Sequence, residues 1–300
     1  MIILIIKEFN INYPLNYNYI AIETTGLSPT NDVIILIGLC LCNKIYQLIG
    51  ENLKDEEIIL KKTCDILKSK DLLAYNGNFE GKFLREKLKL YGISSNIKID
   101  SLIKKLRNYK FLFHLNKYSR EFVEEYFNIE RNTTILGNEV SISYQKYCKD
   151  MDISKLEEIL KRNMENLKTL ISLTNKIDLE IKNILSIKIS SYNFTISKID
   201  MIKNTILING SGDFCENYFN SNKNYTVRLA KDFKLELYTL SDLYDKDNYC
   251  YYVMARDYEG VSNSNKIKSP DKILILYYKD FIIDNIINIF KYIVSKNLSL

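Results

Sequence analysis

The chain has 300 residues, 46% of them hydrophobic, and a formal net charge of +5. This length allows one large domain or a domain with a smaller companion, and so mild a charge permits contact with a polyanion without arguing for it. The sequence holds no run of about 18 uncharged apolar residues, so we expect no membrane span. Six scattered cysteines without CxxC spacing, together with the single His114, argue against zinc and disulfide frameworks and favour a cytoplasmic protein.

Hydrophobic periodicity predicts alternating strands and helices in the first part of the chain. The apolar start meets Lys7 and Glu8 at once, which predicts a buried strand rather than a signal peptide. A nearly continuous apolar run at 33–42 is typical of a central strand. Shorter apolar segments predict further strands, and apolar residues at helical spacing predict helices. The further strands are 45–48, 71–74 and 97–100, and the helices are 56–68, 79–90, 140–148 and 153–185.

Residues 104–138 read as short helices and loops that mix basic and aromatic side chains. Such a mixture can bind single-stranded nucleic acid by charge and by stacking, although a solvated basic face gives the same pattern. The basic members are Lys104, Lys105, Arg107, Lys110, Lys117 and Arg120, and the aromatic ones are Tyr109, Phe111, Phe113 and Tyr118.

From about residue 187 the helical period gives way to short strand-like runs separated by turns. We expect turns at 209–212 and 259–260 and a last strand at 272–277. A final amphipathic helix is expected to begin at Asp280. The sequence therefore predicts two domains, 1–186 and 187–300, of which the second is small and of α+β type.

One octet, Ile20-Ala21-Ile22-Glu23-Thr24-Thr25-Gly26-Leu27, carries an apolar strand into a Thr-Thr-Gly turn. Side chains alternate across a strand, so Ala21 and Glu23 point to the same face. An acidic residue there costs desolvation free energy unless a positive or hydrogen-bonding group meets it. A lone glutamate at a strand end is most often solvated, but Gly26 lets the backbone approach a ligand closely.

The octet resembles the first motif of the DEDD exonucleases, an RNase H-like 3′–5′ exonuclease superfamily. That motif reads Asp-Ile-Glu-Thr-Thr-Gly-Leu, and Ala21 stands where the family has its first Asp. The family's second motif is similar to residues 75–84, where Glu80 replaces an Asp. Its third motif is similar to residues 162–170, where Arg162 replaces the general-base His and Asn166 the metal-binding Asp.

Further matches at 99–102, 122–131 and 137–147 extend the resemblance over roughly residues 19–173 and fit a bacterial branch of predicted RNase H-like exonuclease domains. The resemblance implies an α/β fold in which helices flank a mixed five-stranded RNase H-like sheet. It also implies metal-dependent 3′–5′ exonuclease chemistry in which two divalent ions, Mg²⁺ or Mn²⁺, clamp the scissile phosphodiester. Clustered carboxylates offset the repulsion between two such ions.

The family uses four carboxylates, whereas this chain offers Glu23 and Glu80, so the cofactor is either a weakly held metal at these two residues or none. Arg162 cannot act as a base because guanidinium stays protonated, and the neutral Asn166 is a weaker ligand for a hard cation. We hypothesise that Arg162 lies among Glu23 and Glu80 and replaces a metal as their counter-charge. Three departures at one site favour natural decay of catalysis over a single engineered change at Ala21.

Three functions stay open from the sequence. The first is a catalytically impaired protein that binds single-stranded DNA or RNA, or its 3′ end. The second is a protein-interaction scaffold that keeps the fold for stability alone. The third is a residually active exonuclease that uses Glu23 and Glu80. The positions at which the family receives a strand are Thr24, Thr25, Gly26, Leu27, Tyr75 and Asn76.

Overall fold

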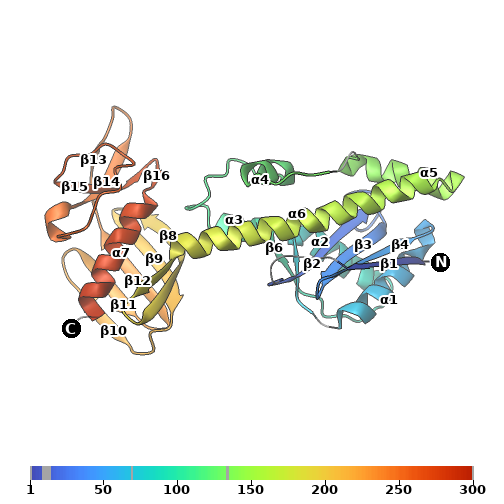
Figure 1. Cartoon of the computed structure of the whole chain (residues 1–300), viewed down its shortest axis with the longest axis horizontal. Coiled ribbons are helices and arrows are strands. Elements are labelled where there is room, and N and C mark those ends of the chain that lie inside the picture. The colour runs from blue at the N-terminus through green and yellow to red at the C-terminus, as the bar shows by residue number, and fades with distance from the viewer. Residues whose placement is uncertain (1, 9–14, 69, 133–134, 299–300) are drawn as a thin grey trace. The chain divides into compact units, whose positions relative to one another are not determined.

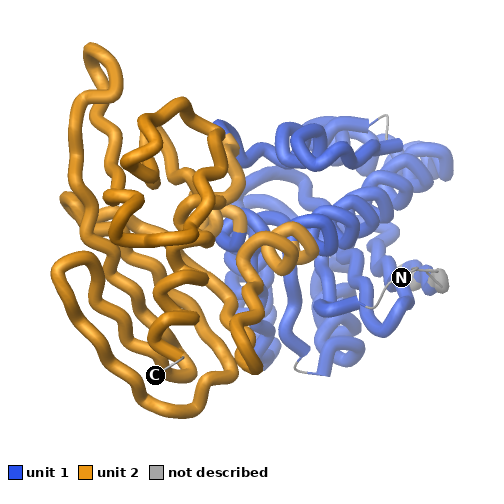
Figure 2. Tube along the Cα trace, turned by 60° about the vertical axis from the view of Figure 1, so that its left-hand side comes forward, with its two compact units in different colours: residues 1–105, 116–177 blue, residues 106–115, 178–300 orange. Residues whose placement is uncertain are grey.

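The computed structural model describes residues 2–8, 15–68, 70–132 and 135–298. The chain forms two compact units, coloured separately in Figure 2. Unit 1 comprises residues 1–105 and 116–177, and unit 2 comprises residues 106–115 and 178–300. The domain boundary expected at residue 187 stays a prediction. Among the described residues, no helix combines the length and the hydropathy that a membrane crossing requires.

Unit 1 is built on a mixed sheet of six described strands in the order β1-β4-β3-β2-β5-β6. The strands are β1 (Ile2–Glu8), β2 (Asn18–Thr24), β3 (Ile34–Leu41), β4 (Lys44–Gly50), β5 (Leu72–Ala74) and β6 (Ile99–Ser101). β5 and β6 run parallel to β2, and the other pairings are antiparallel. The α/β class is confirmed, with one strand more than the five expected because β1 pairs with β4. The strand predicted at the start of the chain is confirmed as β1, which lies at the edge of the sheet. Of its described side chains, Ile3 and Ile5 are half-buried and Ile6 is 53% exposed, so these three do not form the buried face that was expected.

Helices cover both faces of this sheet (Figure 1). On one face, α1 (Glu56–Leu67) and α2 (Gly77–Leu90) share a core with Ile20 and Ile22 of β2. On the other face, α5 (Val140–Asp150) and α6 (Ile153–Leu185) pack on Ile35 and Leu36 of β3. Two short helices, α3 (Leu102–Asn108) and α4 (Arg120–Tyr126), lie between α2 and α5 in the chain. Because side chains alternate along β2, Ala21 and Glu23 are on the α6 face.

A buried carboxylate joins α1 and α2 to the sheet. Glu56 Oε1 accepts a hydrogen bond from the backbone N–H of Ile34 at 2.7 Å, and Oε2 accepts one from the Tyr91 hydroxyl at 2.8 Å. Lys87 Nζ lies 3.3 Å from the same Oε2, and both side chains of this ion pair are almost fully buried. Breaking one partner of such a pair leaves an uncompensated buried charge, so this cluster fixes where α2 lies on β3.

Unit 2 contains two antiparallel sheets and the last helix. The first sheet has the order β10-β11-β12-β9-β8-β7, and the second has the order β13-β14-β15-β16. Phe290 of α7 (Ile283–Leu298) packs on Phe194 and Phe233, with ring centroids 6.0 and 5.1 Å apart. The strands are β7 (Ser186–Ile189), β8 (Tyr192–Ile202), β9 (Thr205–Gly212), β10 (Tyr218–Ser221), β11 (Tyr225–Leu229), β12 (Asp232–Tyr238), β13 (Leu240–Leu243), β14 (Tyr249–Met254), β15 (Ile273–Tyr278) and β16 (Asp280–Phe281).

Two local predictions in unit 2 are wrong. Residues 209–212 belong to β9 rather than to a turn, and a Cβ at Gly210 would lie 2.1 Å from the Thr195 carbonyl oxygen. That glycine therefore permits a close approach of two strands. Asp280 lies in β16 instead of starting the last helix, and its Oδ2 is 2.5 Å from His114 Nδ1.

Candidate functional site

Glu23 lies buried at the end of β2, facing α6. The side-chain amide of Asn166 donates to Glu23 Oε1 at 2.8 Å, and Arg162 Nε lies 3.5 Å from Oε2. Burial raises the pKa of Glu23 above its ordinary value, whereas Arg162 and the hydrogen bond from Asn166 lower it. Both oxygens of this carboxylate therefore have a partner from α6, because residues 162 and 166 fall on one face of the helix.

Asn163 holds α6 on the sheet beside Ala21. Its Nδ2 donates to the Ala21 carbonyl oxygen at 3.0 Å, and its Oδ1 accepts from Gln47 Nε2 at 3.2 Å. Gly38 pairs with Ala21 between β3 and β2, and a Cβ at Gly38 would lie 2.0 Å from Asn163 Oδ1. The glycine thus leaves the space that this fully buried amide fills.

Glu80 lies in the first turn of α2 and is 9% exposed. Its Oε2 has no hydrogen-bond partner among the described residues. Burial raises the pKa of Glu80 to about 8; Arg120 lowers this pKa and Glu23 adds to the rise. A carboxyl with this pKa holds its proton at neutral pH. The guanidinium that acts on Glu80 is that of Arg120, whereas our hypothesis placed Arg162 among both acids.

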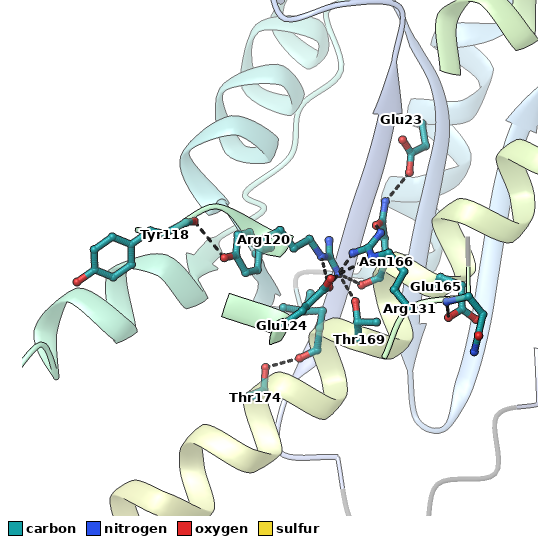
Figure 3. A network of polar contacts seen from close by, with 12 residues as sticks. Glu23, Tyr118, Arg120, Glu124, Arg131, Glu165, Asn166, Thr169 and Thr174 are labelled. Carbon is teal, nitrogen blue, oxygen red and sulfur yellow. Dashed lines mark hydrogen bonds and ion pairs between the residues drawn. The ribbon is translucent and has the colours of Figure 1, made fainter. Parts of the chain in front are cut away.

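Two further arginines complete the network shown in Figure 3. Glu124 Oε1 accepts from Arg120 Nε at 2.9 Å and from Arg131 Nη2 at 2.7 Å. Arg131 Nη1 also donates to Asn166 Oδ1 at 2.8 Å, and Arg120 Nη2 donates to Thr169 Oγ1 at 2.8 Å. Asn166 therefore bridges a guanidinium and the Glu23 carboxylate, with its amide oriented by both.

The turn that follows β2 is closed by Asp32. Thr24 Oγ1 donates to the Gly26 carbonyl oxygen at 2.6 Å, and Thr25 Oγ1 donates to Asp32 Oδ1 at 3.2 Å. A Cβ at Gly26 would lie 2.5 Å from Asp32 Oδ2, so a glycine fits here without displacing the aspartate. Leu27 is 84% exposed, which leaves a large apolar side chain in solvent beside the site.

Of the two positions predicted from the second motif, Asn76 is exposed and Tyr75 is buried. The Tyr75 hydroxyl donates to the Tyr118 carbonyl oxygen at 3.1 Å. The Arg120 guanidinium lies 5.2 Å from the centroid of the Tyr75 ring, within the range of a cation–π contact. The Tyr75 ring therefore packs against the Arg120 guanidinium, and it does not present an exposed face on which a nucleobase could stack.

The basic and aromatic stretch between 104 and 120 mixes buried and exposed side chains. Phe111 and Phe113 are 2% and 1% exposed, so neither ring can stack on a nucleobase without leaving the core. Lys104, Lys110 and Lys117 are exposed. The stretch thus contributes surface charge, whereas its phenylalanines are core residues.

The donor set does not fit a pair of divalent ions. The Ala21 side chain has no metal-ligating atom, and the Glu23 oxygens already contact Asn166 and Arg162. Glu80 is protonated at neutral pH. Asn166 Oδ1, the remaining candidate oxygen, is already bound by Arg131. In the described ranges no three His, Cys, Asp or Glu side chains come together as a metal site. Guanidinium groups occupy the surroundings in which clustered carboxylates would be needed.

Sequence reasoning did not assign a place in this network to five of its residues, which are Arg120, Glu124, Arg131, Asn163 and Thr169. The i,i+4 spacing of Arg120 and Glu124 was a usable signal for an ion pair on one helix face. Arg131 had no such signal, since its contact with Asn166 spans 35 residues of chain.

A family model described as RNase H superfamily matches residues 18–178, more than half of the chain. This segment contains all the site residues named above. The search of curated proteins found no match.

Proposed function

We propose that this chain, which belongs to the RNase H superfamily, binds single-stranded nucleic acid and its 3′ ends through an exonuclease-type domain that does not hydrolyse them. The observation that carries the proposal is the pairing of Glu23 with Asn166 and Arg162. A two-metal nuclease needs ionised, available carboxylates. Here one retained acid is engaged and the other, Glu80, holds a proton at neutral pH. The DEDD-type assignment and the degenerate positions Ala21, Arg162 and Asn166 are part of this proposal.

Two features support binding. Leu27 is 84% exposed at the closed turn, where its side chain can cover a nucleobase. The guanidinium groups of Arg120, Arg131 and Arg162 outnumber the carboxylates that oppose them, Glu23 and Glu124, so the site attracts a polyanion rather than a cation. A phosphodiester that approaches the site meets positive charge directly, without a metal.

Fluorescence anisotropy with labelled 12-nucleotide DNA and RNA strands tests binding, with EDTA present throughout. We expect micromolar or tighter binding that weakens with salt, as phosphate contacts do. Leu27→Ala should weaken binding, whereas the control Leu90→Ala should not, because Leu90 is 66% exposed at the far end of α2. Absence of binding by the wild-type chain at low salt would overturn the proposal.

A nuclease assay with Mg²⁺ or Mn²⁺ on the same strands tests the loss of hydrolysis. We expect full-length strands after prolonged incubation. Shortening of the strand that Glu23→Gln abolishes would instead establish a residual metal-dependent exonuclease.

A second candidate function is a protein-interaction scaffold. The burial of Tyr75 against Arg120 favours it, because side chains of the protein itself fill part of the site. A scaffold predicts that no strand binds at low salt and that Leu27→Ala changes nothing in the anisotropy assay.

A further inference from the structure

A groove of about 570 Å³ lies along α2 in unit 1, and none of its lining residues belongs to the acid and arginine network. Its α2 side carries Asn78, Lys82 and Arg85, and its other side carries Ser95 and Asn96. These five side chains are exposed. The groove therefore presents hydrogen-bond donors and two cations, over a floor that includes the buried Leu84 and Leu88.

Gly81 keeps this groove open. It lies in the interior of the 14-residue helix α2, where glycine costs about 1 kcal/mol relative to alanine. A Cβ at Gly81 would meet no atom within 4 Å, so packing does not require a glycine there. Gly77 differs, because its Cβ would lie 2.5 Å from the Asp100 carbonyl oxygen. Any larger side chain at position 81 would project between Asn78 and Arg85.

The charges of the groove favour an anion. Lys82 and Arg85 are three residues apart, so they lie on one face of α2. Neither forms an ion pair within the described ranges, whereas the groove's acid, Glu86, is half-buried. Lys82 and Arg85 are the sixth and ninth residues of α2, so the positive charge of the groove comes from these two side chains.

The groove also adjoins the residues to which the proposed function assigns strand contact. Gly77 lines it, and Gly77 directly follows Asn76. A strand that contacts Asn76 can therefore continue along α2 towards Lys82 and Arg85 without leaving unit 1.

We propose that this groove binds phosphate groups of single-stranded nucleic acid through Lys82 and Arg85, with Asn78 and Asn96 as neutral donors. The proposal rests on the proposed function and adds to it a path for the bound strand along α2. A surface that only solvates its charges would show no dependence on the shape at Gly81.

The test measures strand affinity of the full chain by anisotropy over a range of salt concentrations. Lys82→Gln with Arg85→Gln should weaken binding and reduce the slope of log affinity against log salt by about 1.4, since each contact to a single strand contributes about 0.7. The matched control is Lys146→Gln with Lys149→Gln, an exposed pair of the same spacing on α5. This control should leave the slope unchanged.

Gly81→Gln tests the shape of the groove without changing charge. It should raise the stability of α2 and still weaken strand binding, whereas Gly81→Ala should raise stability and leave binding intact. If the wild-type chain binds strands, and both Gly81→Gln and the double variant Lys82→Gln with Arg85→Gln bind them as tightly as wild type, the groove proposal is overturned and the proposed function stands. If the wild-type chain binds no strand at low salt, the proposed function is overturned as well.

Discussion

Asn166 and Glu23 are 143 residues apart in the chain, and the amide of the first donates to the carboxylate of the second at 2.8 Å. An amide nitrogen gives this carboxylate a donor, whereas a metal-binding aspartate at position 166 would give it a negative neighbour. Since Arg131 donates to the other end of the same amide, Asn166 cannot rotate to offer its oxygen to a cation without losing two contacts. Asn166 therefore gives Glu23 a hydrogen-bond donor at a position where an aspartate would add a second negative charge.

Restoring carboxylates tests that view. Ala21→Asp with Asn166→Asp adds two acids, but we expect no stabilisation by Mn²⁺, because Arg162 and Arg131 neutralise them. Adding Arg162→His should create a Mn²⁺ site, and saturation at 100 times the dissociation constant would then stabilise the chain by about 2.7 kcal/mol. Thermal unfolding with and without Mn²⁺ measures this. A Mn²⁺ effect on the wild-type chain would contradict the expectation.

Arg162→Met should destabilise the chain because Glu23 loses its nearest cation. The side chain of Arg162 is 17% exposed, so we expect about 1 to 3 kcal/mol, below the cost of breaking a fully buried pair. Lys161→Met, at the exposed neighbouring position, is the control and should have little effect. Urea unfolding of Arg162→Met, Glu23→Gln and the double variant gives their coupling energy. Additive effects would show that the 3.5 Å contact contributes nothing.

Gly38→Ala should destabilise the chain by more than about 2 kcal/mol, because the new Cβ would lie 2.0 Å from Asn163 Oδ1. The cost should shrink when Asn163→Ala removes the clashing amide, so the double variant should be more stable than the sum of the two single changes implies. Chemical unfolding of the three variants checks this. Equal costs of Gly38→Ala with and without Asn163 would rule out the proposed clash.

Glu80 should make stability depend on pH. The folded chain holds the Glu80 proton up to about pH 8, whereas the ordinary pKa is 4.5. Between these values the folded state binds more protons than the unfolded state, so the free energy of unfolding falls as pH rises. Glu80→Gln should remove the part of that fall that Glu80 contributes, whereas the raised pKa of Glu23 leaves its own part in place. The free energy of unfolding of the variant should therefore exceed that of wild type by an amount that grows to the order of 2–4 kcal/mol by pH 9. Glu86→Gln, on the same helix, is the control; urea unfolding at pH 5, 7 and 9 measures each difference.

Local periodicity predicted α6 over its full observed length and α1 to within one residue. It failed at residues 209–212, where two glycines suggested a turn. The glycine at 210 instead lets β8 and β9 approach closely, a tertiary demand that composition does not reveal. The prediction that the last helix begins at Asp280 failed for a similar reason. A carboxylate just before an apolar helix is typical of a helix start, and the sequence does not show that Asp280 pairs in a strand instead.

At the site, sequence spacing brought out the residues on α6 because positions 162 and 166 share a helix face. It could not supply the partner at each position. Whether Arg162 or Arg120 acts on Glu80 depends on where α4 packs, and nothing in the spacing of residues 104–138 encodes that. Burial was equally hidden, since the sequence shows Phe111 and Tyr75 as aromatic residues without showing which are in the core.

Glu124 accepts hydrogen bonds from both Arg120 and Arg131. Burial raises the pKa of Glu124, but the hydrogen bonds and charges of Arg131, Thr169 and Arg120 outweigh burial and hold this pKa below its usual range. Because this anchor lies on α4, the two guanidinium groups that it binds are held independently of strand β2 and helix α2, which supply the retained acids. A new acid that arose at position 21 or 166 would meet guanidinium groups already in place and be neutralised within the protein. We therefore expect a single acidic substitution at either position to change the pairing inside the site rather than to create a cation site.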